Sequence, residues 1–156
     1  MAEHLEIAEG GKAEKYALLY EQIVCLMEDE KDVIANMANV AAMIQETFRF
    51  WWAGFYRVLD DVLVLGPFQG PLACTRIKCG KGVCGTAWQK DETQVVPAVE
   101  LFPGHIACSS LSRSEIVVPM HKNGQVSGVL DIDSEKLATF DEIDQVWLEK
   151  IVRLFE

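Results

Sequence analysis

The sequence predicts an α+β domain: a mostly antiparallel β-sheet with N- and C-terminal helices packed on it. Two amphipathic helical patterns precede the first strands, most of the strand-like runs are joined as hairpins, and a further helical pattern ends the chain. The 156 residues, half of them hydrophobic, suit one domain with a sizeable core. No repeat, linker or low-complexity segment divides the chain. We therefore expect a flexible tail over residues 1–11, followed by a single domain over residues 12–156.

Three helices are predicted from apolar residues that recur at three- and four-residue steps. The first is expected from Lys12 to about Asp29, and the second from about Asp32, its N-cap, to Phe48. The last is expected from about Asp141 to Leu154, capped by Thr139 or Asp141. The residues predicted to face inward are Tyr16, Leu19, Tyr20, Ile23, Leu26 and Met27; then Val33, Met37, Val40, Ala41 and Ile44; then Ile143, Val146, Trp147, Ile151 and Leu154.

The strands are predicted from short runs rich in β-branched and aromatic residues. WWAGFYRVL and VLVLGPF, separated by Asp60-Asp61, form one hairpin, and SEIVVPM and QVSGVLDID form another around Asn123-Gly124. Between the hairpins we expect a strand in ACTRIK, a short helix over about Cys84–Gln89, a brief strand in TQVVP, and mostly loop from Val99 to Arg113.

The charge of the chain narrows the classes of partner. The net charge of −10 and the pI of about 4.7 argue against nucleic acid and anionic membranes, which attract Lys/Arg-rich faces. A small neutral or zwitterionic ligand fits this balance better. The N-terminal residues lack the basic and apolar regions of a secretory signal, and no apolar run reaches the length of a membrane span. We therefore expect a cytoplasmic protein.

Three of the five cysteines lie in glycine- or proline-bounded turns. They are Cys74, Cys84 and Cys108. An odd number of cysteines excludes a complete disulfide framework, and clustered thiols in a reducing compartment favour redox chemistry. Cys84 falls near the start of a predicted helix, where amide dipoles lower a thiol pKa. The alternative is that these thiols only fill space at the ends of elements. No chemistry is expected of Cys25 or Cys79.

Zinc binding is a second interpretation of the same region. Cys74, Cys79 and Cys84 are each separated by four residues, and His105 and Cys108 form an H-x2-C pair. The region contains no C-x2-C knuckle, so we expect no metal and no other cofactor. His105 either holds Cys108 as a thiolate or makes a hydrogen bond within its turn.

Three carboxylates occur at strand ends. Glu115 opens a strand, and Asp131 and Asp133 end another, on the same face because side chains alternate along a strand. Neighbouring carboxylates repel one another unless they are solvated, paired or used by a ligand. They therefore indicate either a solvated strand end or a pocket that grips an ammonium group and donates protons.

Two aromatic residues share one face of the first predicted strand. Trp52 and Tyr56 are in this position, and Phe50 is a third candidate. They belong either to the core or to the wall of a small apolar or cationic pocket.

The motifs GPFQGPLACTRIKCGKGVCG (66–85), FPGHIACSSLSRSEIVVP (102–119) and GVLDIDS, taken together, resemble the free methionine-(R)-sulfoxide reductases. These enzymes are single GAF-domain proteins, and the resemblance extends from about Tyr16 to Leu154. It implies a GAF-like fold. The chain departs from many members at Ala98, where an acidic residue is common, and at Ser109, where Asp is common.

The resemblance also implies roles for individual residues. Cys108 matches the catalytic nucleophile, Cys74 the cysteine that forms a disulfide with it, and Cys84 an alternative resolving thiol. Substrate binding and protonation are implied for Glu115, Asp131 and Asp133, and the lining of the pocket for Trp52 and Tyr56. Either Glu115 or Asp133 is the proton donor.

The activity implied is the thiol-dependent reduction of free L-methionine (R)-S-oxide through a cysteine sulfenic acid and an intramolecular disulfide. A thioredoxin-like dithiol restores the enzyme, which the resemblance implies is a homodimer. The alternative is a non-catalytic GAF sensory module that binds a small ligand or senses oxidants.

Overall fold

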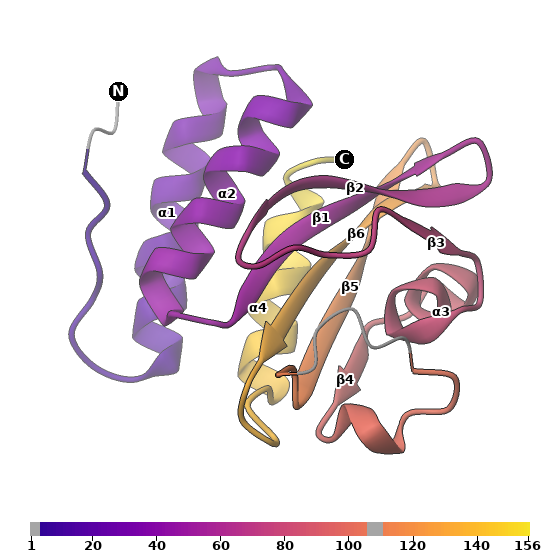
Figure 1. Cartoon of the computed structure of the whole chain (residues 1–156). Helices are drawn as coiled ribbons and strands as arrows, with labels where there is room; N and C mark the ends of the chain where they lie inside the picture. Colours follow the sequence, from indigo (N-terminus) through magenta and orange to yellow (C-terminus); the bar gives the residue numbers. More distant parts are fainter. Residues whose placement is uncertain (1–3, 106–110) are drawn as a thin grey trace.

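The computed structural model describes residues 4–105 and 111–156, and its elements follow the predicted order (Figure 1). In chain order these are α1 (Lys12–Asp29), α2 (Val33–Phe48), β1 (Trp52–Leu59), β2 (Val62–Gln69), β3 (Arg76–Lys78), α3 (Gly82–Lys90), β4 (Gln94–Val96), the 3₁₀ turn η1 (Val99–Leu101), β5 (Ser114–Lys122), β6 (Gln125–Ser134) and α4 (Glu142–Arg153). The predicted α+β class is confirmed.

The six strands form one antiparallel sheet in the order β3-β2-β1-β6-β5-β4. Both predicted hairpins are confirmed. Asp60 and Asp61, at φ 49° and 62°, give the β1–β2 turn two consecutive residues in the left-handed region, as a tight two-residue hairpin turn requires. The strand order places β1 and β6 side by side at the centre, with β5 next to β6. Side chains from these three strands therefore lie near the centre of the sheet on both of its faces.

Helices cover both faces of the sheet but in unequal number (Figure 1). On one face, α1, α2 and α4 build the larger core with side chains such as Phe55, Ile116 and Leu130. On the other face, α3 packs over a smaller cluster that includes Tyr56, Val117 and Val129. Alternation along each strand sends neighbouring residues to opposite cores. The smaller layer leaves part of its sheet face open, and the site described below lies there.

The capping predictions for two helices are confirmed. Asp32 caps α2, where its side chain accepts a hydrogen bond from the backbone N–H of Ala35. Asp141 caps α4 and takes part in a reciprocal capping box with Asp144. For α4 the structure therefore selects Asp141 over Thr139.

Parts of the predicted inward faces are wrong. Ile143 and Val146 of α4 are 40% and 57% exposed, and Val33 at the start of α2 is 46% exposed. Ile151 is buried as predicted, but Asp144 is fully buried as well, and it accepts hydrogen bonds from the Tyr16 hydroxyl at 2.6 Å and from Lys12 Nζ at 2.5 Å. A buried, paired carboxylate rotates the helix away from the face that apolar spacing indicates.

The N-terminal segment makes contacts with α1. The backbone N–H of Glu6 donates to Gln22 Oε1 at 2.8 Å, and Gln22 Nε2 donates to the carbonyl of Glu6 at the same distance. Leu5 packs against the larger core. The predicted flexibility of residues 1–11 and the boundary of the domain at residue 12 stay predictions.

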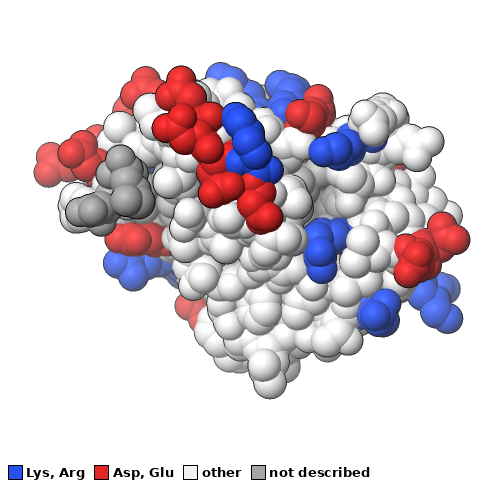
Figure 2. Space-filling model, turned by 90° about the horizontal axis from the view of Figure 1, so that it is seen from above, with Lys and Arg blue, Asp and Glu red and all other residues white. Residues whose placement is uncertain are grey.

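Charges of both signs are distributed over the surface (Figure 2). In that view acidic side chains gather on the side of α1 and α2, and the opposite side carries a smaller acidic group and separate basic side chains on a largely uncharged surface. Among the described residues, no helix combines the length and apolar character needed to cross a membrane.

Candidate active site

A pocket lies on the sheet face that carries α3. Its floor comes from β1, β5 and β6, and its sides come from α3, the segment before β3, His105 and Ser112. The centre of a water molecule can move through a volume of about 50 Å³ in this pocket. That volume holds several waters or a small ligand. The lining residues are Trp51, Trp52, Tyr56, Leu72, Ala73, Ile77, Lys81, Gly82, Val83, Cys84, His105, Ser112, Glu115, Asp131 and Asp133.

The three predicted carboxylates meet in this pocket. Glu115 on β5 pairs directly with Asp133 on β6, and Asp131 lies two residues away from Asp133 on the same strand face. Glu115 and Asp131 are 5% and 6% exposed, so the interpretation as a solvated strand end is wrong. The sheet register thus gathers three acidic groups, of which Glu115 and Asp131 are buried and Asp133 is partly exposed.

Burial and mutual repulsion perturb these carboxyl groups. Burial is the main cause that raises the pKa of Glu115 well above its ordinary value, and the charges of Asp131 and Asp133 add to it. The pKa of Asp133 is also raised well above its ordinary value by burial and by Asp131, although Ser112 opposes the shift by donating a 2.7 Å hydrogen bond to Asp133 Oδ1. Burial raises the pKa of Asp131 as well. Closely coupled acids of this kind can retain protons at neutral pH and donate them.

Asp131 also presents an unused acceptor to the pocket. Its Oδ1 atom is buried and has no hydrogen-bond partner within residues 4–105 and 111–156. A buried acceptor without a donor is costly, and such groups are common where a ligand supplies the missing hydrogen bond.

Cys84 projects into the same cluster from the first turn of α3. Its Sγ lies 3.9 Å from Glu115 Oε1. The prediction of a lowered thiol pKa is wrong. Burial, followed by the charges of Asp131 and Glu115, raises the pKa of Cys84 well above its ordinary value and outweighs the helix N-terminus. The raised pKa favours the neutral form of the Cys84 thiol.

The aromatic wall is formed by Trp52 and Tyr56. Their rings stack at a centroid distance of 6.0 Å, and Trp52 also stacks on Phe68 at 5.1 Å. Both residues belong to the smaller core that borders the pocket. Phe50 does not join them: it packs in the larger core on the opposite face, against Phe48 and Phe140.

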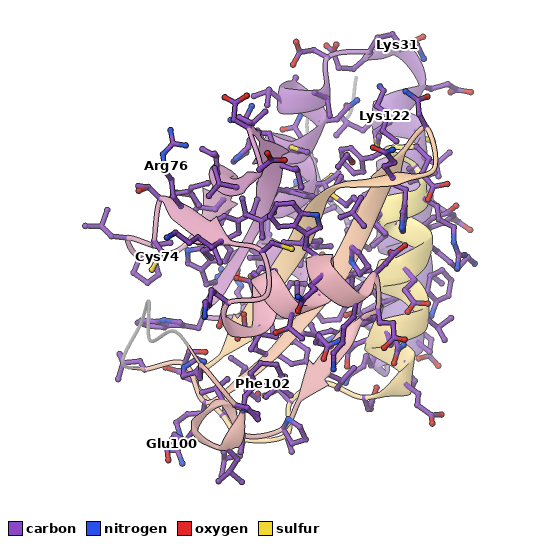
Figure 3. The ribbon with its side chains drawn as sticks, turned by 90° about the vertical axis from the view of Figure 1, so that its right-hand side faces the viewer. Lys31, Cys74, Arg76, Glu100, Phe102 and Lys122 are labelled. Carbon is purple, nitrogen blue, oxygen red and sulfur yellow. The ribbon has the colours of Figure 1, made fainter. Side chains whose placement is uncertain are left out.

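Two hydrogen bonds fix the segment that carries Cys74 to this wall. Trp52 Nε1 donates to the carbonyl of Pro71 at 3.1 Å, and the Tyr56 hydroxyl donates to the carbonyl of Cys74 at 2.9 Å. Figure 3 shows Cys74 at the margin of the molecule beside α3, with Phe102 of the η1 region beyond the same helix. The aromatic residues thus position Cys74 next to the pocket.

The described cysteines differ in oxidation state. Cys25, Cys79 and Cys84 are free, and the first two are exposed. Cys74 is disulfide-bonded. Cys108, the predicted nucleophile, lies outside the described residues, so its role stays a prediction.

Several residues in the pocket are not singled out by the sequence. Ser112 donates a hydrogen bond to Asp133, and Lys81 and Trp51 line the pocket. A serine or lysine in a loop gives no sequence signal of this kind. His105, by contrast, is a residue that the sequence does single out; it lines the pocket, and its Nδ1 is buried with no partner among the described residues.

A metal-ligand group occurs at one place in the described part of the chain. One donor atom each from Cys84, Glu115 and Asp131 lie within 4.8 Å of one another. This set differs from the zinc ligands that the sequence spacing offers. A thiolate and two carboxylates would suit a zinc site with an open position, but here the same three groups have raised pKa values, so protons compete with any cation.

Comparisons with known proteins agree on one family. A model of the GAF domain matches residues 32–156. GAF domain-containing protein A of Dictyostelium discoideum is 58% identical, and the match covers 100% of this chain and 99% of that protein. Free methionine-R-sulfoxide reductase of Escherichia coli is 45% identical over 93% of this chain and 88% of its own length.

A solved structure gives the same result. Free methionine-R-sulfoxide reductase of Neisseria meningitidis, crystallised in complex with its substrate, superposes with a TM-score of 0.96. It is 52% identical, and the match covers 98% of this chain and 93% of that one.

Proposed function

The chain belongs to the GAF-domain family of free methionine-R-sulfoxide reductases, and we propose that it reduces free L-methionine (R)-S-oxide to L-methionine. The observation that carries the proposal is the cluster of the buried Glu115 and Asp131 with the partly exposed Asp133, beside an aromatic wall. Relatives bearing that name, one of them solved with its substrate, support the same activity.

The pocket offers a partner for each end of the substrate. A protonated carboxyl group, on Glu115 or Asp133, donates a hydrogen bond to the sulfoxide oxygen, and the raised pKa values support this protonation state. The free Oδ1 of Asp131 accepts from the α-ammonium. The rings of Trp52 and Tyr56 contact the methyl end. A methionine residue within a peptide lacks the α-ammonium, which explains selectivity for the free amino acid.

The redox steps follow from thiol chemistry. The Cys108 thiolate attacks the sulfur of the protonated sulfoxide, the sulfoxide oxygen is transferred to Cys108 as a sulfenic acid, and methionine leaves with its sulfur reduced by two electrons. The thiol of Cys74 attacks that sulfur, which releases water and forms a disulfide. The disulfide-bonded state of Cys74 and its fixed position beside the pocket support this role. Cys84 is a secondary resolving thiol, because its buried neutral form attacks slowly.

The remaining steps rest on the family resemblance. A thioredoxin-like dithiol supplies two electrons and returns both cysteines to thiols, which suits a cytoplasmic setting. We propose that the active form is a homodimer. Light scattering of the purified protein measures its mass and tests that assembly.

The activity is tested with the two epimers of free methionine sulfoxide and dithiothreitol as reductant. The proposal expects methionine from the R epimer, little from the S epimer, and loss of turnover in Cys108→Ser. A matched Cys25→Ser control, which removes an exposed thiol on α1, retains full turnover. Turnover of neither epimer excludes the proposal. Ligand binding with only stoichiometric oxidation would instead support the sensory module.

A further inference from the structure

The segment around Cys74 differs in charge from the rest of the chain. From Val62 to Lys90 the sequence contains four of the 14 basic residues and none of the 24 acidic ones, although the whole chain has a net charge of −10. The basic residues are Arg76, Lys78, Lys81 and Lys90. The segment that carries the redox cysteine is therefore locally basic in an otherwise acidic protein.

The side chains of this segment face solvent. Arg76 and Lys78 are exposed on the same side of β3, whereas Ile77 between them is buried in the smaller core. Leu72, two residues before Cys74, is 90% exposed, the highest value among the exposed large hydrophobic side chains. Arg76 and Cys74 lie on the same margin of the molecule in Figure 3. An exposed apolar side chain and a basic one therefore border the cysteine from either side.

From this arrangement, and resting on the proposed function, we infer that Leu72, Arg76 and Lys78 form the docking surface for the protein that reduces the Cys74 disulfide. The partner is a dithiol protein whose surface around its thiols is apolar at the centre and acidic at the rim. The apolar Leu72 supplies contact area next to the reacting sulfur, and the two cations steer an acidic partner toward it.

The position in the fold favours such an encounter. β3 is the outer strand of the sheet, so no further strand of the described chain covers its free side. The Tyr56 hydroxyl and the backbone N–H of Leu65 hold the carbonyls of Cys74 and Thr75, which keeps this segment rigid. A pre-formed surface loses little conformational entropy when a partner binds.

The exchange that this surface serves is balanced in atoms and electrons. A partner thiolate attacks one sulfur of the Cys74 disulfide, the S–S bond breaks, and the other cysteine leaves as a thiolate that takes up a proton. The second partner thiol then attacks the mixed disulfide and displaces the remaining cysteine of this chain as a thiol. The partner ends as a disulfide, and this chain has gained two electrons and two protons.

Basic residues on an outer strand have another use, because they discourage edge-to-edge aggregation. Charge reversal separates the two uses. A glutamate at position 76 or 78 blocks aggregation as well as a basic residue does, but it repels an acidic partner. If charge reversal weakens turnover with a protein reductant but not with a small-molecule reductant, the basic residues serve in docking.

The experiment measures steady-state turnover of methionine sulfoxide with two reductants: thioredoxin regenerated by thioredoxin reductase and NADPH, and dithiothreitol. Arg76→Glu is expected to raise the KM for thioredoxin about fivefold, and Lys78→Glu, farther from Cys74, is expected to raise it less. The rate with dithiothreitol stays unchanged, because neither residue lines the pocket. Lys122→Glu, an exposed charge reversal at the β5–β6 turn, is the matched control and leaves both reductants unaffected.

Higher ionic strength is expected to raise the thioredoxin KM of the unmodified protein and to have little effect on Arg76→Glu. Equal KM values for Arg76→Glu and Lys122→Glu would overturn the inference. So would a parallel loss with dithiothreitol, which indicates damage to the site. Absence of turnover by the unmodified protein with dithiothreitol would overturn the proposed function, and this inference with it.

Discussion

Glu115 and Asp133 face each other across β5 and β6 as directly paired residues of the antiparallel sheet. Both carboxyl groups have a raised pKa, and burial is the main cause for each. Directly opposed like charges destabilise a sheet, so this pair persists because at least one member is protonated or a ligand intervenes. On the proposed function, one member of this pair donates the proton and the other joins Asp131 in binding the α-ammonium.

The first prediction assigns these two tasks. Glu115→Gln and Asp133→Asn remove one acid each with little change of shape. The variant that lacks the proton donor is expected to lose about 100-fold or more in kcat, whereas the other mainly raises KM for the sulfoxide. Steady-state kinetics with saturating dithiothreitol measure both values. Equal effects of the two substitutions on kcat and KM would contradict the division.

The pH dependence of turnover checks the same assignment. The donor must be protonated, so kcat falls as pH rises through its raised pKa. The variant without the donor lacks this decline. An unchanged alkaline limb in both variants would show that neither acid is responsible.

A second prediction concerns stability. Because the folded-state pKa values of Glu115, Asp131 and Asp133 are raised, the native state binds more protons than the unfolded chain. Their contribution is fully present below the ordinary carboxyl pKa and is lost as pH rises through the raised values. Between pH 5 and pH 8 the free energy of unfolding should therefore fall less in Glu115→Gln than in the unmodified protein. Urea unfolding at several pH values measures this difference, and the exposed Glu100→Gln serves as a control that keeps the original slope.

A third prediction concerns the reactivity of Cys84. Its raised pKa and its burial make it a poor nucleophile at neutral pH, so iodoacetamide should alkylate it more slowly than the exposed Cys25 and Cys79. Asp131→Asn removes the neighbouring charge with the largest effect and should shift the pH dependence of the Cys84 rate to lower pH. Peptide mass spectrometry on the reduced protein follows each thiol. Alkylation of Cys84 at the rate of Cys79 would refute the neutral buried thiol.

A fourth prediction concerns the positioning of Cys74. Tyr56→Phe keeps the stacked ring but removes the hydroxyl that donates to the Cys74 carbonyl, at a cost of about 1 kcal/mol in stability. The methionine released in a single turnover should be unchanged, whereas the sulfenic acid should persist longer and give more dimedone adduct. Trp52→Phe, which loses the hydrogen bond to Pro71, provides the comparison for a change elsewhere in the wall. Unaltered dimedone labelling in Tyr56→Phe would show that this bond does not position Cys74.

The element order was predictable because each local signal has a local cause. Period-two alternation correctly placed Asp131 and Asp133 on one strand face, and the Asp60-Asp61 turn marked the first hairpin. The candidate cysteines, carboxylates and aromatic residues could also be named from the sequence, because their residue types and their positions in turns and strands are local features. Alternation along a strand and the residues of a tight turn follow from backbone geometry, so they can be predicted without knowing the tertiary structure.

The environment of those groups was not predictable, because residues distant in the chain create it. The start of α3 suggested an acidic thiol at Cys84, but β5 and β6 bring buried carboxylates against it and reverse the shift. Apolar spacing placed Ile143 inward, but Tyr16 and Lys12, more than 120 residues away, turn Asp144 inward instead. Periodicity follows from the chain's own geometry, whereas pKa values and burial depend on which side chains share a space with little water, and that is fixed only when the sheet and helices pack together.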